Sequence, residues 1–144
     1  MSRIGLRPDR ISIVGISHFH RDHTGQAAEF PQAHLLIGRE DYEILEQKRP
    51  SDIAPWLGEK ADLEKVVGDK DVFGDGSVIM LSTPGHTLGH HSLLVRLPKF
   101  GPVMLSGDLW HFSAQVRENE MAASTLDRAA ELASRDRFCG RWPT

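Results

Sequence analysis

Six of the eight histidines in this 144-residue chain fall in two short clusters. The first cluster is the run at residues 18–23, with the pattern H-x-H-x-D-H, and the second lies at residues 86–91. Imidazole combined with carboxylate is a borderline-soft ligand set that suits Zn²⁺, with Fe²⁺, Mn²⁺ or Co²⁺ as substitutes. The first cluster therefore predicts a metal site, and a surface loop of solvated histidines is the alternative.

The spacing within the first cluster predicts how its donors divide. In an extended or turning loop, residues two apart point the same way. We therefore expect His18 and His20 to share one metal ion, while Asp22 and His23 turn toward another.

Each group of candidate donors follows a predicted strand. Residues 11–17 form an almost continuous apolar run, which is typical of a buried strand, and residues 78–81 and 103–105 are also predicted to be strands. These strands end just before His18, His86 and Asp108. Loops held by a rigid sheet often carry functional residues, so the three strand ends are expected to form one site.

The other elements complete an α/β (α+β) pattern. Further strands are predicted at 33–37 and 92–97, and helices at 25–30, 39–48 and about 118–135. Residues 51–67 are ambiguous, and we interpret them as a helical insertion. A chain of this length is too short for two ordinary domains, so residues 1–144 are predicted to form a single domain.

The composition limits which binding partners and which cellular location are expected. With 40% hydrophobic and 26% charged residues, the chain is predicted to be globular. A formal net charge of -3 with scattered basic residues gives no reason to expect a nucleic-acid partner. No membrane span and no signal peptide are expected, because the apolar stretches are too short. The single cysteine, Cys139, excludes an internal disulfide and favours a cytoplasmic location.

Three ordered motifs resemble those of the metallo-β-lactamase superfamily. They are SHFHRDHTG at 17–25, TPGHTLGH at 83–90 and SGD at 106–108. Over residues 8–138 the chain is most similar to the N-acyl-homoserine-lactonase-like branch, which is associated with quorum quenching. The resemblance implies an αβ/βα sandwich and a hydrolase that acts on a small-molecule lactone or ester.

The resemblance also implies a role for each candidate donor. It assigns His18, His20 and His86 to a first Zn²⁺, Asp22 and His23 to a second, and Asp108 as a bridge between the two. A hydroxide between the metals is then the nucleophile, and Asp22 transfers a proton. Asp22 and Asp108 are thus the implied catalytic residues.

The remaining histidines receive other roles. His90 resembles a family residue that supports the ligands from behind, and loop packing is the alternative. His111 stands where lactonases often carry a substrate-contacting tyrosine; it is predicted to bind substrate, with an ordinary loop histidine as the alternative. His34 and His91 are predicted to be structural or exposed.

The chain departs from the family pattern in two places. Only 17 residues precede His18, where family members have several strands, and no histidine follows His111, where the family supplies one more ligand to the second metal. The resemblance therefore implies a fold that is incomplete at both its N- and C-termini, and a second metal site that binds more weakly. Unpaired sheet edges predict either a homodimer or aggregation.

Two other functions stay open at this point. A glyoxalase-II-like thioesterase shares the first two motifs, although Thr24-Gly25-Gln26 in place of a double glycine favours the lactonase. A non-catalytic metal-binding remnant is the second alternative. Two metals per chain, with turnover that a chelator abolishes, would distinguish the enzyme from the remnant.

Overall fold

The computed structural model describes residues 5–118 and 120–140. Contacts divide the chain into two compact units, Met1–Val66 and Val67–Thr144, which we call the N-terminal and C-terminal units. The predicted single domain stays a prediction. In the described part of the chain, no helix is both long and apolar enough to cross a membrane. The predictions for residues 1–4 and for the side chain of Cys139 fall outside the described residues.

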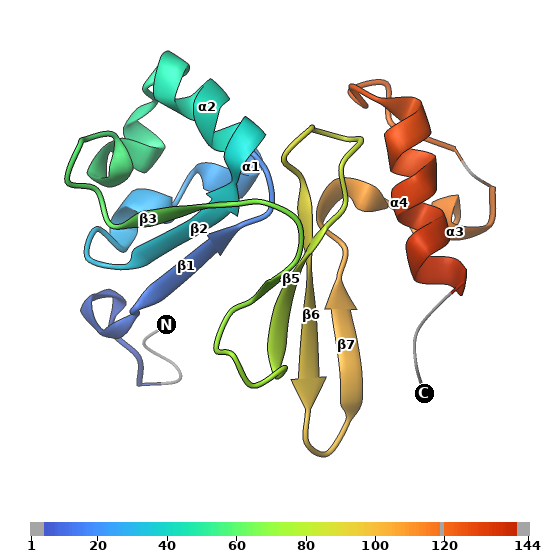
Figure 1. Cartoon of the computed structure of the whole chain (residues 1–144), viewed down its shortest axis with the longest axis horizontal. Coiled ribbons are helices and arrows are strands. Elements are labelled where there is room, and N and C mark those ends of the chain that lie inside the picture. Colours follow the sequence, from blue (N-terminus) through green and yellow to red (C-terminus); the bar gives the residue numbers. More distant parts are fainter. Residues whose placement is uncertain (1–4, 119, 141–144) are drawn as a thin grey trace. The chain divides into compact units, whose positions relative to one another are not determined.

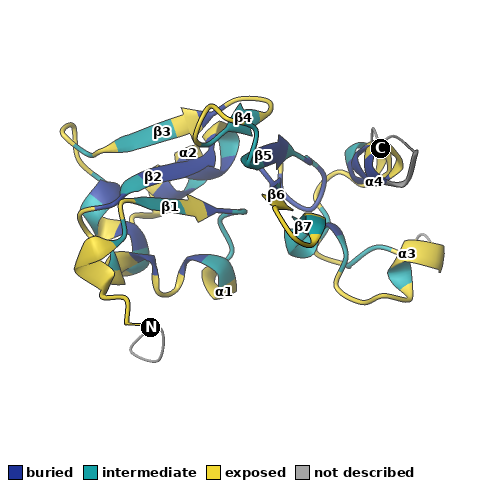
Figure 2. Cartoon of the chain, turned by 90° about the horizontal axis from the view of Figure 1, so that it is seen from below, coloured by how far each residue is buried: buried dark blue, intermediate teal, exposed yellow. Residues whose placement is uncertain are grey.

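The N-terminal unit contains a parallel sheet with the order β1-β2-β3 (Figure 1). Its strands are β1 (Ile13–Ile16), β2 (His34–Gly38) and β3 (Leu63–Val66). The central strand β2 is buried over residues 35–38 (Figure 2). A continuous apolar run at the centre is what a parallel strand needs when both of its faces are covered. The strands predicted at 11–17 and 33–37 are confirmed, with slightly different bounds, but the expectation that the first is buried is wrong, because within β1 only Ile16 is buried.

The helices of this unit are short except for one. They are the 3₁₀ turns η2 (Pro8–Arg10), η3 (Ala27–Glu29) and η4 (Ser51–Trp56), and the α-helices α1 (Arg21–Thr24) and α2 (Arg39–Lys48). Helix α2 has the predicted bounds, and its Tyr42 and Leu45 enter the core. Tyr42 donates its hydroxyl to the carbonyl oxygen of Trp56 at 2.6 Å, and burial raises the pKa of that hydroxyl.

Two predictions for this unit need correction. The helix expected at 25–30 is only the 3₁₀ turn η3. The helical insertion expected at 51–67 is wrong in its second half, because residues 63–66 form β3 and pair with β2. Pairing with an exposed strand edge is a tertiary interaction, and it overrides a weak local preference.

The C-terminal unit contains an antiparallel sheet with the order β4-β5-β6-β7. Its strands are β4 (Lys70–Asp71), β5 (Val78–Ser82), β6 (His91–Leu97) and β7 (Gly101–Leu105). The strands predicted at 78–81, 92–97 and 103–105 are confirmed. Beyond β7 come η5 (Gly107–Leu109), α3 (Gln115–Glu118) and α4 (Arg128–Gly140). With one parallel and one antiparallel sheet, the α/β fold class is confirmed.

The helix predicted from about residue 118 begins ten residues later, at Arg128. Asp127 explains the late start, because its Oδ1 accepts hydrogen bonds from the N–H groups of Ala129 and Ala130, as an N-cap does. The N–H of Asp127 itself donates to Gly85 O at 2.9 Å. The spacing of the alanines therefore indicated the helix correctly but did not indicate the residue at which it begins.

Candidate functional site

The first candidate donors lie on the loop that leaves β1. His18 is fully buried, and its Nε2 lies 3.0 Å from Nδ1 of His20. The backbone of His20 is extended (φ -66°, ψ 147°), because this residue caps the N-terminus of α1. The two imidazoles therefore lie together, and that they share one metal ion stays a prediction.

Ser17 orients two rings of this loop. Its Oγ lies 3.1 Å from Nδ1 of His18 and 3.0 Å from Nδ1 of His23. A hydroxyl oxygen has two lone pairs and can accept a hydrogen bond from each ring. With Nδ1 protonated in this way, Nε2 of each ring is left to bind a metal. The sequence prediction missed this role, and its one signal was the position of Ser17 directly before the motif.

Asp22 and His23 lie on the first turn of α1 rather than on an extended loop. Nε2 of His23 is 3.6 Å from Oδ2 of Asp22. The side chain of Asp22 is 78% exposed, whereas that of His23 is 24% exposed. Asp22 can therefore exchange protons with solvent.

A buried carboxylate on α2 supports the same loop. Asp41 is fully buried, and its Oδ2 accepts a hydrogen bond from the N–H of Phe19 at 3.0 Å. Phe19 stands between the two paired histidines, so Asp41 anchors the backbone that carries both. The sequence carries no sign of this role for Asp41, since an acidic residue in the first turn of a helix is also common without it.

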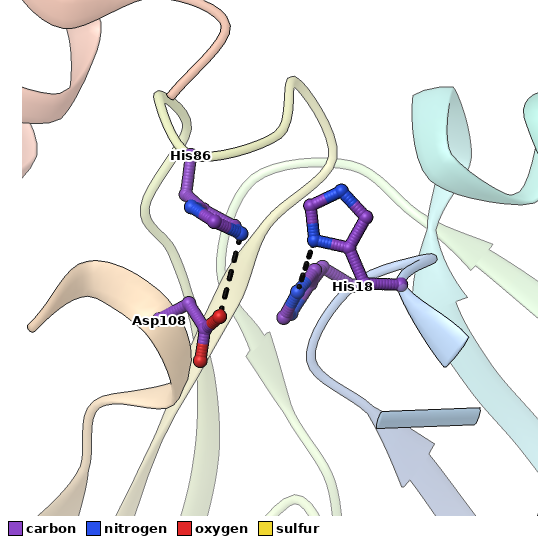
Figure 3. Close-up of side chains that lie close together, drawn as sticks. His18, His86 and Asp108 are labelled. Atoms are coloured by element: carbon purple, nitrogen blue, oxygen red, sulfur yellow. Dashed lines mark hydrogen bonds and ion pairs between the residues drawn. The ribbon is translucent and has the colours of Figure 1, made fainter. Parts of the chain in front are cut away.

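The C-terminal unit supplies a second pair of donors from two segments. We call residues 83–90, between β5 and β6, the His86 segment, and residues 106–111, after β7, the Asp108 segment. His86 is buried, and its Nε2 lies 3.4 Å from Oδ2 of Asp108 (Figure 3). The antiparallel pairing of β5, β6 and β7 brings these two segments together. That the loop at 18–23 joins them in one site stays a prediction.

Gly85 is required by the way α4 packs against the His86 segment. Its φ of +144° is one that L side chains rarely adopt, and a Cβ on this residue would lie 2.3 Å from Cα of Glu131. A glycine gives the backbone before His86 the conformational freedom that this geometry needs.

His90 lies behind Asp108, in the position predicted for a supporting residue. It is fully buried, and its Nε2 accepts a hydrogen bond from the N–H of Asp108 at 3.1 Å. Nδ1 therefore carries the proton, and it faces Oγ1 of Thr83 at 2.8 Å. The hydroxyl of Thr83 lies 3.1 Å from that of Ser92, which donates to Ser106 O. His90 is thus neutral and joins the His86 segment to the Asp108 segment.

His111 lies beside the same carboxylate. Its Nε2 is 3.2 Å from Oδ2 of Asp108, and its side chain is 26% exposed. It also borders a cavity of about 480 Å³ whose other walls are mostly apolar: Met104, Trp110, Phe112, Val116 and Phe138, with Ser106 and Ser113.

Two further histidines have structural contacts. His34 Nδ1 lies 2.6 Å from Oδ1 of Asp62. His91 is buried, with its ring nitrogens 2.8 and 3.0 Å from the carbonyl oxygens of Gly89 and Gly68. Both contacts agree with the prediction that these histidines have structural rather than ligand roles.

The donor atoms within each unit fit a divalent metal. In tetrahedral coordination with bonds of about 2.1 Å, two ligand atoms lie about 3.4 Å apart. The separation is 3.0 Å between the nitrogens of His18 and His20, and 3.4 Å between His86 Nε2 and Asp108 Oδ2. Nitrogen with carboxylate oxygen is also the donor chemistry that Zn²⁺, Fe²⁺, Mn²⁺ and Co²⁺ accept.

A family model described as "Metallo-beta-lactamase superfamily" matches residues 1–137. The chain belongs to this superfamily. The match runs through both units, so the two sets of donors are parts of one superfamily sequence.

Curated superfamily relatives include N-acyl homoserine lactonases. The chain is 34% identical to the N-acyl homoserine lactonase AttM of Azorhizobium caulinodans, over 86% of this chain and 52% of that protein. It is 36% identical to AttM of Rhizobium radiobacter, over 90% of this chain and 48% of the relative. The chain therefore spans about half the length of the curated relatives that it matches.

Solved structures agree with the superfamily fold. The fold is similar to that of an N-acyl homoserine lactone hydrolase with the product N-hexanoyl-L-homoserine bound at its catalytic metal centre. The TM-score is 0.79 and the identity 26%, covering 96% of this chain and 54% of that chain. A probable metal-dependent hydrolase from Staphylococcus aureus shares the fold alone, with a TM-score of 0.74 at 15% identity.

Proposed function

We propose that this chain carries the metal-binding part of a hydrolase that opens lactone or ester bonds, with N-acyl homoserine lactones as the substrate class. The donors of both units would serve one centre that holds two divalent metals. His18, His20 and His86 would bind the first ion, Asp22 and His23 the second, and Asp108 both. The observation that carries this proposal is the spacing of donor atoms within each unit, since separations of 3.0 and 3.4 Å allow both atoms of a pair to contact one metal ion.

A bound divalent metal supplies a Lewis acid that polarises a carbonyl group and makes a water molecule more acidic. The surrounding residues hold the donors in place. Ser17 fixes the ring orientation of His18 and His23, while His90 accepts a hydrogen bond from the backbone of Asp108. Loss of a supporting contact of this kind typically weakens metal binding by about 10- to 100-fold.

Two side chains are proposed to act on the substrate. Asp22 has an exposed carboxylate and can pass a proton to the leaving alkoxide and exchange it with water. His111 borders the apolar cavity, and its ring nitrogen that does not face Asp108 can form a hydrogen bond with the substrate. An acyl lactone has both a polar ring and an apolar tail, so it matches a polar residue at the edge of an apolar cavity.

The test combines metal analysis with a substrate screen on the purified chain. We expect about two metals per chain by elemental analysis, hydrolysis of acyl homoserine lactones, loss of turnover with a chelator and recovery with Zn²⁺ or Co²⁺. Hydrolysis of thioesters but not lactones would favour the glyoxalase-II-like alternative. One metal or none, without turnover of either substrate, would support the non-catalytic remnant.

A further inference from the structure

Helix α4 of the C-terminal unit buries two charged side chains. Glu131 is 0% and Arg135 is 2% exposed, and Nη2 of Arg135 donates to Oε1 of Glu131 at 2.6 Å. Removing two ions from water costs several kcal/mol each, and apolar residues of similar volume are often at least as stabilising. A contribution to the stability of α4 is therefore not sufficient to explain why this ion pair is buried.

Arg135 directs its other donors at the polypeptide backbone. Its Nε donates to Leu109 O at 3.1 Å, and Leu109 directly follows Asp108. Its Nη1 donates to Glu120 O at 2.8 Å. Because a guanidinium group is planar and its donors diverge at fixed angles, these bonds fix the Asp108 segment relative to α4.

The same helix holds the His86 segment. Ser134 donates its hydroxyl to Pro84 O at 2.7 Å. The backbone of Glu131 packs against Gly85, leaving no room for a Cβ there. Oε2 of Glu131 also accepts a hydrogen bond from Oγ1 of Thr125 at 2.7 Å, and the N–H of the residue after Thr125 donates to Gly85 O at 3.1 Å.

We propose that Glu131, Ser134 and Arg135 are positioning residues that hold His86 and Asp108 at the separation that metal binding requires. This inference rests on the proposed function, because it assumes that these two side chains bind a metal. The three residues act through the backbone of Pro84, Gly85 and Leu109 rather than on substrate. A site whose donors are already at bonding separation binds a metal more tightly than one that must be ordered first.

The decisive variant is the double substitution Glu131→Met/Arg135→Met in the full chain. It removes both buried charges together, so that neither is left without its partner. We expect Co²⁺ to bind about 10- to 100-fold more weakly, measured by titration of the metal-free protein followed by visible absorption. The urea midpoint of the metal-free protein should stay close to that of the parent chain.

A matched control is offered by Arg137, which follows Arg135 by two residues on the same helix. Arg137 pairs with Asp69 and donates to Ser82 O in β5. The double substitution Asp69→Asn/Arg137→Met therefore removes an ion pair of α4 that does not anchor the carbonyls of Pro84 or Leu109. We expect it to leave Co²⁺ affinity unchanged. An equal loss of affinity in both double variants would overturn the positioning role.

A milder variant covers the case in which the double substitution fails to fold. Arg135→Lys keeps the charge beside Glu131 but cannot reach both backbone carbonyls with a single ammonium group. We expect about 10-fold weaker Co²⁺ binding; unchanged binding would overturn the inference while leaving the proposed function intact. If the parent chain itself binds no Co²⁺, the metal centre and the inference are both wrong. Co²⁺ binding without any hydrolysis would contradict only the proposed activity.

Discussion

The two units present their candidate donors in different ways. In the N-terminal unit, His18 and His20 are neighbours on one loop, and a single carboxylate from α2 anchors the backbone between them. In the C-terminal unit, His86 and Asp108 come from segments that are distant in the chain. Two β-hairpins and helix α4 are needed to bring those segments together.

The difference is in what determines the geometry of the donors: the local sequence in the N-terminal unit and the tertiary structure in the C-terminal unit. A short loop has few conformations, so residue spacing nearly decides which side chains meet. Donors on separate segments meet only if a sheet and a helix fold correctly around them. We therefore expect the C-terminal donors to be more sensitive to packing changes than the N-terminal donors.

The largest effect should follow the removal of one donor from either unit. His20→Ala and His86→Ala are each expected to lower kcat/KM for lactone hydrolysis by about 10³-fold, because several kcal/mol of charge stabilisation are lost with the first metal. If the units share one centre, both variants lose the same ion, and the double variant is little worse than either single variant.

Elemental analysis measures the number of metal ions per chain in the two single variants and in the double variant. His34→Ala is the control, because this histidine pairs with Asp62. Independent losses, in which His20→Ala and His86→Ala each remove a different ion, would show that the units bind metals separately.

The next largest effect is expected on the free energy of unfolding when either of two glycines, one from each unit, is replaced by alanine. Gly85→Ala should destabilise the chain by about 3 kcal/mol, because the new Cβ would overlap the backbone of Glu131. In the N-terminal unit, Gly25→Ala places a Cβ 2.9 Å from Arg21 O, but within a single turn of helix that can adjust. We expect about 1 kcal/mol there.

Urea denaturation gives both values, and Gly68→Ala is the control for backbone strain alone. Gly68 has a φ of +68° and no atom within 4 Å of the added Cβ. Equal destabilisation by Gly85→Ala and Gly68→Ala would mean that contact with α4 is unimportant.

A smaller effect is expected from Asp41→Asn. An amide oxygen can still accept the hydrogen bond from Phe19, but without the charge that strengthens it. Co²⁺ affinity should fall by about 10-fold at most, less than for Glu131→Met/Arg135→Met. A loss of Co²⁺ affinity as large as that of Glu131→Met/Arg135→Met would contradict the proposed difference between the units. The N-terminal donors would then depend on tertiary contacts as strongly as the C-terminal donors.

The smallest effect should be seen at low pH. Burial tends to raise the pKa of Asp69, but hydrogen bonds from Arg137 and from the N–H of Ser82 outweigh it, so the pKa lies below its usual value. The stabilisation from Asp69 is therefore complete above the unfolded pKa, at about pH 4, and is lost as the pH falls through the folded pKa.

Because the Asp69–Arg137 pair is partly exposed, its contribution should stay below about 1 kcal/mol. Urea midpoints at pH 7 and pH 3 are the measurement. Asp69→Asn should lose less stability than the parent chain between these pH values, and an identical loss in both proteins would contradict this assignment.

Elements with a strong repeating pattern were predicted well. Helix α2 has its predicted bounds, since apolar residues at helical spacing and the proline at residue 50 define it locally. Strand β3 was mistaken for helix because its pairing partner is distant in the chain. The predicted start of α4 is too early because Asp127 caps the helix, while the N–H groups of Leu126 and Asp127 donate to the distant carbonyl of Gly85.

The sequence by itself determined which residues could bind a metal and that His18 and His20 would lie together, because residue type and a spacing of two are local properties. Only the tertiary structure decided how His86 and Asp108 meet, and it alone revealed the supporting roles of Asp41 and Arg135. The physical reason is that a supporting contact is a hydrogen bond between distant segments. Neither partner carries a sign of it in its own sequence neighbourhood.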